Sequence, residues 1–361
     1  MRKIYFLVAL SAMILFTGAG CINFGGGAAQ GPMGMFRSSD KRETWKEINT
    51  YPTSKGIVSL AGIKVYDVHA DPNDINAYYL ATRGQGLYYT YNNGDSWQTV
   101  GELGGMFVYA LAVDTKDKCT IYVSDGQHIY KTVDCTRSWQ LVYTEERPTQ
   151  KLIALAVDYG NNATIYGAEA NGEILISNDA GRSWRTEKRF GFELKDLIAD
   201  PNQPKRLYAA AYRQGLWRSD DSGVSWTDLS GGLNNYSDAK NFYRLVLNPA
   251  QNNSLFWISK YGILRSDNAG ATWNELKLLT PPGSVNIYGF GMNPSNQREM
   301  YYTGTILGEN NKHVRSTFYK TSDGGVNWVT KKLPTNTIPI IMWVHPKNNS
   351  TLFMGFTILE K

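Results

Sequence analysis

The sequence lacks the patterns by which most metalloenzymes and serine hydrolases are recognised. It has four histidines, His69, His128, His313 and His345, and their scattered spacing matches no arrangement of metal ligands. It contains neither a Gly-x-Ser-x-Gly nucleophile motif nor a phosphate-binding loop. No long stretch places apolar residues at helical spacing. We therefore expect no metal, no cofactor and an all-β chain.

A strong charge of either sign is missing as well. The chain has 37 Lys and Arg residues against 32 Asp and Glu residues, which gives a formal net charge of +5 at pH 7. Two of the positive charges belong to Arg2 and Lys3 at the N-terminus. The remaining excess is too small to indicate binding to nucleic acid or to an anionic membrane surface.

The apolar run at residues 4–16 is too short to span a membrane, and it follows Arg2 and Lys3. This order predicts a secretory signal peptide over residues 1–20. The residues Gly18-Ala19-Gly20 before Cys21 resemble the bacterial lipobox, although Gly18 stands where Leu is usual. We expect a lipidated Cys21 with a Gly-rich tether over residues 21–34, in an extracytoplasmic, membrane-anchored lipoprotein of the cell surface or periplasm. The alternative is a conventionally cleaved secreted protein.

With Cys21 assigned to lipid, only Cys119 and Cys135 remain. We interpret residues 119–124 and 128–133 as the two strands of a hairpin that turns around Gln127. The two thiols are equidistant from that turn, so we expect a disulfide between them in an oxidising compartment.

An eight-residue box, [Ser/Thr]-x-[Asp/Asn]-x-Gly-x-[Ser/Thr]-Trp, occurs seven times. The opening hydroxyl and the closing Trp are present in every copy. The Gly is replaced only by Arg42 and Thr136, and the second hydroxyl only by Asn327. The third and eighth positions of the seven boxes are Asp40 and Trp45, Asn92 and Trp97, Asp134 and Trp139, Asp179 and Trp184, Asp221 and Trp226, Asn268 and Trp273, and Asp323 and Trp328.

Each residue type of the box has a structural use. The Asp or Asn oxygen can accept hydrogen bonds from the following backbone N–H groups and close a turn. Gly permits a positive φ, and Trp can fill the space between layers of a repeated structure. We interpret the box as a folding device. A calcium loop is the alternative, but the box lacks the closing bidentate Glu.

The spacing of the boxes predicts a propeller. Their Trp residues recur 42 to 55 residues apart, and each unit contains four short strands separated by tight turns. The first unit has only its third and fourth strands, whereas residues 340–359 supply a first and a second strand without a box. The sequence therefore predicts an all-β, seven-bladed β-propeller over residues 35–361, closed by one blade shared between the two chain ends.

The boxes resemble the Asp-box, or bacterial neuraminidase repeat, over residues 35–361. The short run before each box, typified by Gly86-Leu87-Tyr88-Tyr89, is most similar to that of photosystem II stability/assembly-factor propellers and of sortilin-type and xyloglucanase-type propellers. The first resemblance implies a non-catalytic protein that binds a protein or an assembly intermediate. Neuraminidases carry an Arg-Ile-Pro signature that is absent here. Xyloglucanase-type enzymes use two Asp residues across a cleft between two propellers, and this chain predicts one propeller.

The resemblance places function on the face formed by the turns between second and third strands and by the connections into the first strands. Two longer segments, residues 230–241 and 304–316, also belong to that face, either as binding loops or as tolerated insertions. The residues that we predict to contact a partner there are Arg83, Tyr109, Glu169, Lys195, Arg213, Arg244, Tyr261 and Tyr288. His69 and His345 fall near first turns and are expected on the opposite face.

Four carboxylates, Asp67, Asp125, Glu169 and Asp196, are also expected on the functional face. A glycosidase needs two carboxylates at a defined separation, and members of this set could pair across the ring. Because no intact enzyme signature is present, we expect a non-catalytic protein-binding or assembly scaffold. The alternative is a carbohydrate-active protein, either a glycoside hydrolase or a lectin.

Overall fold

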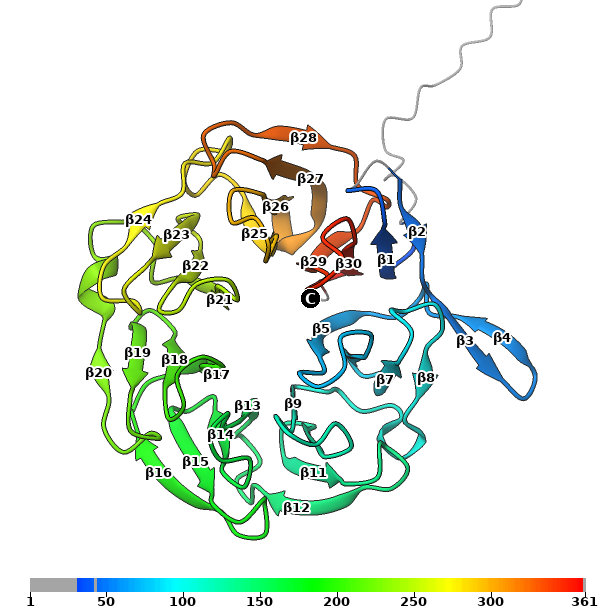
Figure 1. Cartoon of the computed structure of the whole chain (residues 1–361), viewed down its shortest axis with the longest axis vertical. Helices are drawn as coiled ribbons and strands as arrows, with labels where there is room; N and C mark the ends of the chain where they lie inside the picture. Colours follow the sequence, from blue (N-terminus) through cyan, green and yellow to red (C-terminus); the bar gives the residue numbers. More distant parts are fainter. Residues whose placement is uncertain (1–30, 42–43, 360–361) are drawn as a thin grey trace, which may run out of the picture. The chain divides into compact units, whose positions relative to one another are not determined.

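The computed structural model describes residues 31–41 and 44–359. Residues Gly31–Lys361 form one compact unit, in which seven four-stranded antiparallel sheets surround a central channel (Figure 1). The prediction of an all-β, seven-bladed propeller is confirmed. Within the described part of the chain, no helix is long and apolar enough to cross a membrane. The predicted signal peptide and the predicted lipidation of Cys21 lie outside the described residues.

Six blades are continuous in the chain, and each runs from an innermost first strand to an outermost fourth strand. Their strands are β5 (Val65–Ala70), β6 (Tyr78–Thr82), β7 (Leu87–Thr90) and β8 (Gln98–Thr99); β9 (Ala110–Val113), β10 (Ile121–Ser124), β11 (His128–Thr132) and β12 (Gln140–Thr144); β13 (Leu152–Val157), β14 (Ile165–Glu169), β15 (Glu173–Ser177) and β16 (Arg185–Arg189); β17 (Leu194–Ala199), β18 (Leu207–Ala211), β19 (Gly215–Ser219) and β20 (Thr227–Asp228); β21 (Phe242–Leu247), β22 (Leu255–Ser259), β23 (Ile263–Ser266) and β24 (Asn274–Glu275); and β25 (Asn286–Met292), β26 (Met300–Leu307), β27 (His313–Thr321) and β28 (Val329–Lys331).

The seventh blade joins the two ends of the described chain. Its strands follow the order β29 (Ile338–Val344), β30 (Leu352–Thr357), β1 (Gly34–Ser38) and β2 (Lys46–Glu47). β1 and β30 are antiparallel, with Phe36 opposite Met354. The predicted shared blade is thus present, and it closes the ring without leaving an open sheet edge between the two ends.

Side chains close the boxes with closely similar hydrogen bonds, except that the amide Nδ2 of Asn92 and of Asn268 donates to the second box hydroxyl. In the fourth box, Ser177 Oγ donates to Asp179 Oδ1 at 2.8 Å and accepts from the Gly181 N–H at 2.8 Å. Asp179 also accepts from the N–H of Ser183 at 2.9 Å and from its hydroxyl at 2.6 Å. The hydroxyl and N–H groups that bond the carboxylate lower the pKa of Asp179 to about 2.

Two consecutive box residues have a positive φ, which is one more than the sequence predicted. The fifth residue is normally Gly and has a positive φ, for example 88° at Gly181. The fourth residue is also left-handed although its type varies: φ is 60° at Ala180, 59° at Lys41 and 57° at Cys135. Left-handed backbone is unfavourable for residues with a Cβ, so the box hydrogen bonds must stabilise it.

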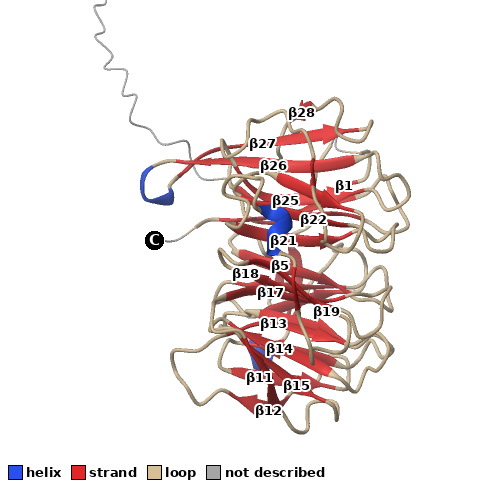
Figure 2. Cartoon of the chain, turned by 90° about the vertical axis from the view of Figure 1, so that its left-hand side faces the viewer, coloured by secondary structure: helices blue, strands red, loops and turns tan. Residues whose placement is uncertain are grey.

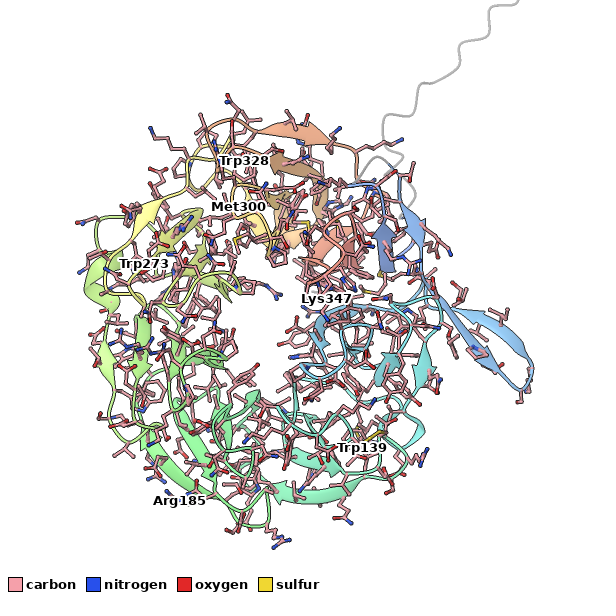
Figure 3. The ribbon with its side chains drawn as sticks, in the orientation of Figure 1. Trp139, Arg185, Trp273, Met300, Trp328 and Lys347 are labelled. Carbon is pink, nitrogen blue, oxygen red and sulfur yellow. A yellow bond between two sulfur atoms is a disulfide. The ribbon has the colours of Figure 1, made fainter. Side chains whose placement is uncertain are left out.

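The apolar core is divided among the seven contacts between neighbouring blades. Each of the seven clusters of buried side chains draws on two adjacent blades and includes one box Trp. Trp97 is 1% exposed and donates from Nε1 to the Ile48 carbonyl, which follows β2 of the preceding blade, at 2.7 Å. Trp226 packs edge-on against Phe190 of the preceding blade with a centroid distance of 5.2 Å. The box Trp residues Trp139, Trp273 and Trp328 lie at separate points around the ring (Figure 3). Each box therefore fastens its blade to the one before it.

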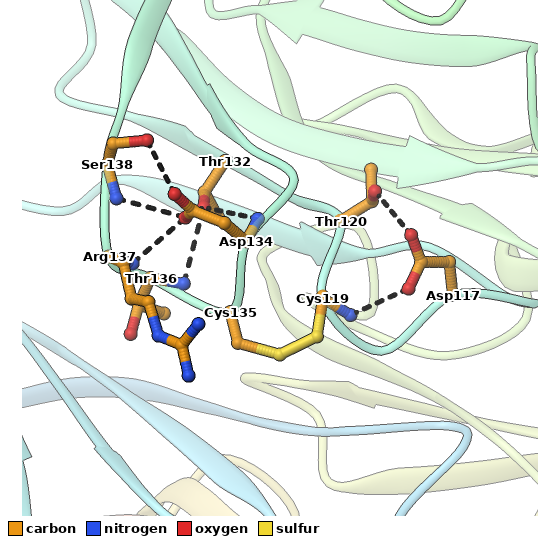
Figure 4. Close-up of a disulfide and its surroundings, with 9 residues drawn as sticks. All are labelled: Asp117, Cys119, Thr120, Thr132, Asp134, Cys135, Thr136, Arg137 and Ser138. Carbon is orange, nitrogen blue, oxygen red and sulfur yellow. Dashed lines mark hydrogen bonds between the residues drawn. A yellow bond between two sulfur atoms is a disulfide. The ribbon is translucent and has the colours of Figure 1, made fainter.

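Cys119 and Cys135 form a disulfide beside the box that has Thr136 in place of Gly (Figure 4). The hairpin register pairs Ile121 with Thr132, so Cys119 falls opposite Asp134. The centre of the hairpin therefore lies between Gly126 and Gln127, half a residue before the predicted centre at Gln127. The left-handed backbone of Cys135 nevertheless returns its thiol to Cys119.

Three segments interrupt the regular blades. A hairpin of β3 (Thr50–Thr53) and β4 (Gly56–Ser59) projects from the rim of the ring (Figure 1), and the sequence analysis did not predict it. Most of the insertion at residues 304–316 extends the β26–β27 hairpin beyond one face, and it carries the short helix η3 (Glu309–Asn311) (Figure 2). Residues 230–241 begin with η2 (Ser230–Leu233); a further short helix, η1 (Gly101–Leu103), follows β8.

Candidate functional site in the central channel

The innermost strands line a channel cavity of about 620 Å³. Near their N-terminal ends, six of the seven first strands shift register against the second strand. Such β-bulges redirect side chains and are common beside active sites. Three of these shifts are followed by a charged residue in the channel wall: Asp67 on β5, Asp196 on β17 and Arg244 on β21.

Asp67 and Arg244 meet across the channel. β5 belongs to the first blade and β21 to the fifth, on the other side of the central opening (Figure 1). Arg244 Nη1 lies 3.5 Å from Asp67 Oδ1, and Arg244 Nη2 lies 3.5 Å from the Ile340 carbonyl. The two side chains are 26% and 31% exposed, so this ion pair is partly shielded from water. The prediction placed these residues on one face but could not pair them.

His69 belongs to the same site, which corrects the expectation that it lies on the opposite face. It follows Asp67 by two residues on β5, and its Nε2 lies 3.6 Å from Asp67 Oδ2. Burial lowers the pKa of His69, which favours the neutral imidazole. The error arose because residue 69 was assigned to the turn, whereas β5 continues through Ala70.

Asp196 stands in the channel wall without an ion-pair partner among the residues described. Its Oδ1 accepts a hydrogen bond from the Leu197 N–H at 2.9 Å. Burial in the channel, followed by the negative charge of Asp67, raises the pKa of Asp196 to about 6. The channel therefore contains two carboxyl groups in different environments: Asp67 pairs with a guanidinium, and Asp196 holds its proton to a higher pH than an ordinary Asp.

An aromatic cluster adjoins these carboxyl groups and consists of Tyr66, Phe107 and Tyr109. The Phe107 and Tyr109 rings stack with centroids 4.1 Å apart, and Tyr66 meets Phe107 edge-on at 4.9 Å. The Arg83 guanidinium lies over Tyr66 at 5.1 Å, and Lys151 Nζ lies 5.8 Å from the centroid of Tyr109. Phe107 was missed by the sequence analysis because it precedes β9 with no motif to mark it.

The structure separates the eight predicted contact residues into groups. Arg83, Tyr109, Lys195 and Arg244 line the channel. Arg213 lines a second cavity of about 490 Å³ beside residues 233–241. Tyr261 packs against Tyr236 at 5.2 Å, and Tyr288 packs against Tyr243 at 5.6 Å. Among the four predicted carboxylates, Asp125 bonds to its own turn and to His128 Nδ1 at 2.9 Å, outside the channel lining.

Glu169 is removed from the binding surface because its side chain is fully buried. It accepts from Arg147 Nη2 at 2.8 Å, and the same guanidinium pairs with Glu145 at 2.7 Å and with Glu173 at 3.1 Å. Burial, followed by the neighbouring carboxyl of Glu145, raises the pKa of Glu169. These contacts with the half-exposed Arg147 explain why the buried carboxyl group at the end of β14 holds the structure together instead of meeting a partner.

Replacing Glu169 with Gln is expected to stabilise the protein at alkaline pH. The pKa of a free Glu carboxyl in the unfolded chain is about 4, and in the folded protein the pKa of Glu169 is higher. The stability that this difference contributes is fully present below the unfolded pKa, and it is lost as the pH rises from the unfolded pKa through the folded pKa. The wild type should lose stability relative to Glu169→Gln at up to about 1.4 kcal/mol per pH unit in that window. Denaturant unfolding at pH 5, 7 and 9 measures this, and equal pH dependence in both proteins would contradict it.

No group of three or more His, Cys, Asp or Glu side chains is positioned to hold a metal ion within residues 31–41 and 44–359. The candidate groups of the channel are its two Asp residues, His69, the cations and the aromatic rings.

The sequence was compared with known proteins, and no family model matches it. A xyloglucanase from Paenibacillus sp is 25% identical over 276 residues, which are 70% of this chain and 23% of that protein. Among solved structures, a GH74 xyloglucanase from Xanthomonas campestris superposes with a TM-score of 0.64 at 14% identity, covering 87% of this chain and 52% of that chain. The structure of YCF48 bound to D1 peptide superposes with a TM-score of 0.58 at 17% identity, covering 83% of this chain and 94% of that chain.

These comparisons bear out the resemblance to both propeller groups, and the two structural matches show the shared fold. This chain spans about a quarter of the length of the curated relative. The curated relative is named a xyloglucanase, and this finding contradicts the prediction that the chain is not an enzyme. The comparisons favour the glycoside hydrolase alternative over the non-catalytic scaffold.

Proposed function

We propose that this protein is a glycoside hydrolase that cleaves a polysaccharide in the central channel, with Asp196 as general acid and Asp67 as the second carboxylate. The observation that supports this most is the placement of both carboxyl groups in the wall of one cavity, where burial, followed by the charge of Asp67, raises the pKa of Asp196. A carboxyl group that holds its proton near neutral pH, beside a second carboxyl group, is the arrangement that glycosidases use for their general acid.

The proposed roles follow from the contacts of each residue. Protonated Asp196 donates its proton to the glycosidic oxygen as the bond from that oxygen to the anomeric carbon breaks. The carboxylate of Asp67 either activates a water molecule or attacks the anomeric carbon, and its negative charge stabilises the cationic character of the sugar in the transition state. Arg244, through its ion pair, and the neighbouring His69 hold Asp67 in position.

In this proposal one propeller supplies both carboxylates. The two-propeller arrangement of xyloglucanase-type enzymes sets its Asp residues on opposite sides of a cleft. Here β5 and β17 belong to the first and fourth blades, which lie on opposite sides of the central channel (Figure 1). The channel wall therefore replaces the cleft between two propellers.

The purified protein tests this proposal when it is incubated at pH 5 to 6 with soluble xyloglucan, other neutral β-glucans and acidic polysaccharides. We expect new reducing ends to accumulate with at least one polymer. Failure to release reducing ends from any of them, with a properly folded protein, would overturn the proposal. A protein that captured only a peptide ligand would overturn it as well.

We further propose that the protein acts outside the cytoplasm as a lipoprotein, on the strength of its N-terminal residues and of the disulfide in its second blade. In the native host, Cys21→Ser should move the protein from the membrane fraction to the soluble fraction, because a lipidated N-terminus needs that thiol. Immunoblots of the two fractions measure the shift. Wild-type protein found in the soluble fraction would contradict the anchor.

A further inference from the structure

The Arg83 guanidinium has no acidic partner, and this distinguishes it from the other cations of the channel lining. Arg244 pairs with Asp67, and Lys195 pairs with Glu193. Arg83 forms no ion pair with any residue that the structure describes, and its buried Nε has no hydrogen-bond acceptor among them. A buried donor without a hydrogen-bond partner is costly, and an anion that accepted a hydrogen bond from this Nε would remove that cost.

The surroundings of Arg83 fix the orientation of its donors. Its backbone N–H donates to the Lys64 carbonyl at 3.0 Å, which anchors the residue directly after β6. The guanidinium lies 5.1 Å from the Tyr66 ring centroid and 5.9 Å from that of Phe107. A guanidinium beside aromatic rings keeps its N–H donors in its own plane, where two parallel hydrogen bonds match the geometry of an oxyanion.

A second cation reinforces the same positive region. Lys151 Nζ lies over Tyr109, which stacks on Phe107. No acidic side chain in the described part of the chain pairs with Lys151 or with Arg83. The two cations and the aromatic cluster of Tyr66, Phe107 and Tyr109 lie beside Asp67, which directly follows Tyr66. A neutral glycan would leave both charges uncompensated.

We propose that the substrate is an anionic glycan, in which an oxyanion carried by a sugar ring binds Arg83 while the adjoining sugar packs on the aromatic cluster. This inference rests on the proposed glycoside hydrolase function and adds the substrate class. A uronate carboxylate and a sulfate ester share the required chemistry, since both present a pair of negatively charged oxygen acceptors to the guanidinium. Lys151 adds attraction at longer range, which salt would screen.

The test measures dissociation constants for four hexasaccharides: an oligogalacturonate, the same oligomer after carboxyl reduction, a sulfated carrageenan oligomer, and a neutral xyloglucan oligomer. The proteins are the wild type, Arg83→Gln, Arg83→Lys and, as a matched control, Arg185→Gln. Arg185 is an exposed cation on β16 that pairs with Glu187 at the outer rim, far from the channel (Figure 3). Thermal unfolding of each variant verifies its folding.

We expect the wild type to bind at least one anionic oligomer 10- to 100-fold more tightly than the neutral ones, as a charge-assisted hydrogen bond predicts. Arg83→Gln should remove the preference, Arg83→Lys should retain part of it, and Arg185→Gln should leave it unchanged. The uronate and sulfate arms then identify the anion. A structural role for Arg83 would weaken all four ligands equally and leave their ratio unchanged, which would overturn the inference.

Two further outcomes distinguish failure of the anionic-substrate proposal from failure of the proposed glycoside hydrolase function. Equal binding and equal cleavage of neutral and anionic glycans would overturn the anionic substrate while the glycoside hydrolase function stands. Absence of both binding and cleavage with every glycan would overturn the proposed function and this inference together. If Arg83→Gln fails to fold, two other measurements test the anionic-substrate proposal. They are the ratio of the dissociation constants for neutral and anionic oligomers in Arg83→Lys, and the salt dependence of anionic oligomer binding by the wild type.

Discussion

Asp196→Asn is expected to lower kcat/KM for glycan hydrolysis by roughly 10²- to 10⁴-fold, the usual contribution of a general acid. Asn has the same shape but cannot donate a carboxyl proton to the glycosidic oxygen. Asp228→Asn is the matched control, because Asp228 lies on the exposed outermost strand β20 and should leave the rate unchanged. Reducing-end assays at several substrate concentrations measure the difference.

The pH profile of the wild type gives an independent check on the same residue. Asp196 must be protonated to act, and its pKa is raised to about 6. Activity should therefore fall about tenfold per pH unit above that value. Removing the charge of Asp67 lowers the pKa of Asp196. In Asp67→Asn, any residual activity should therefore begin to fall at a lower pH than the activity of the wild type does. A profile that stays flat to pH 8 would contradict the assignment of Asp196 as the acid.

Trp97→Ala is expected to lower the free energy of unfolding by about 3–5 kcal/mol, the largest stability effect that we predict. The indole of Trp97 is 1% exposed and fills the contact between the seventh and first blades, where the two chain ends close the ring. Its loss also leaves the Ile48 carbonyl without the hydrogen bond from Nε1. Denaturant unfolding with the disulfide intact measures the change.

The control for that prediction is Trp184→Ala. Trp184 is only partly buried, and its Nε1 donates to Gly181 within its own box at 3.1 Å. Because less apolar surface returns to water, the cost should be roughly 1–2 kcal/mol. Equal costs at the two positions, or a cost below about 1 kcal/mol for Trp97→Ala, would refute the view that the box Trp at the contact between the seventh and first blades holds the ring together.

The fold was predictable because the same local chemistry repeats along the chain. Seven copies of a box with one hydroxyl, one amide or carboxyl oxygen and one Trp set the number of blades. The missing first two strands before Ser38 and the missing box after β30 predicted the shared blade. The left-handed fourth residue was not predictable, because Lys41, Ala180 and Cys135 share no side-chain property.

The site was harder to predict because it depends on contacts across the ring. Asp67 and Arg244 are 177 residues apart in sequence, and no local pattern links them. The bulges on β5, β17 and β21 arise from pairing with neighbouring strands and leave no signature in the sequence. Glu169 was misplaced for a related reason, since its partners Glu145 and Arg147 come from a loop of the preceding blade.

The most direct test of the account is a crystal structure of Asp196→Asn in complex with an oligosaccharide that the wild type cleaves. The account predicts a sugar chain in the central channel, with a glycosidic oxygen about 2.6–3.2 Å from the side chain at position 196 and with Asp67 facing the anomeric carbon. A sugar chain bound elsewhere on the propeller, with the channel free of it, would contradict the claim that the channel is the active site.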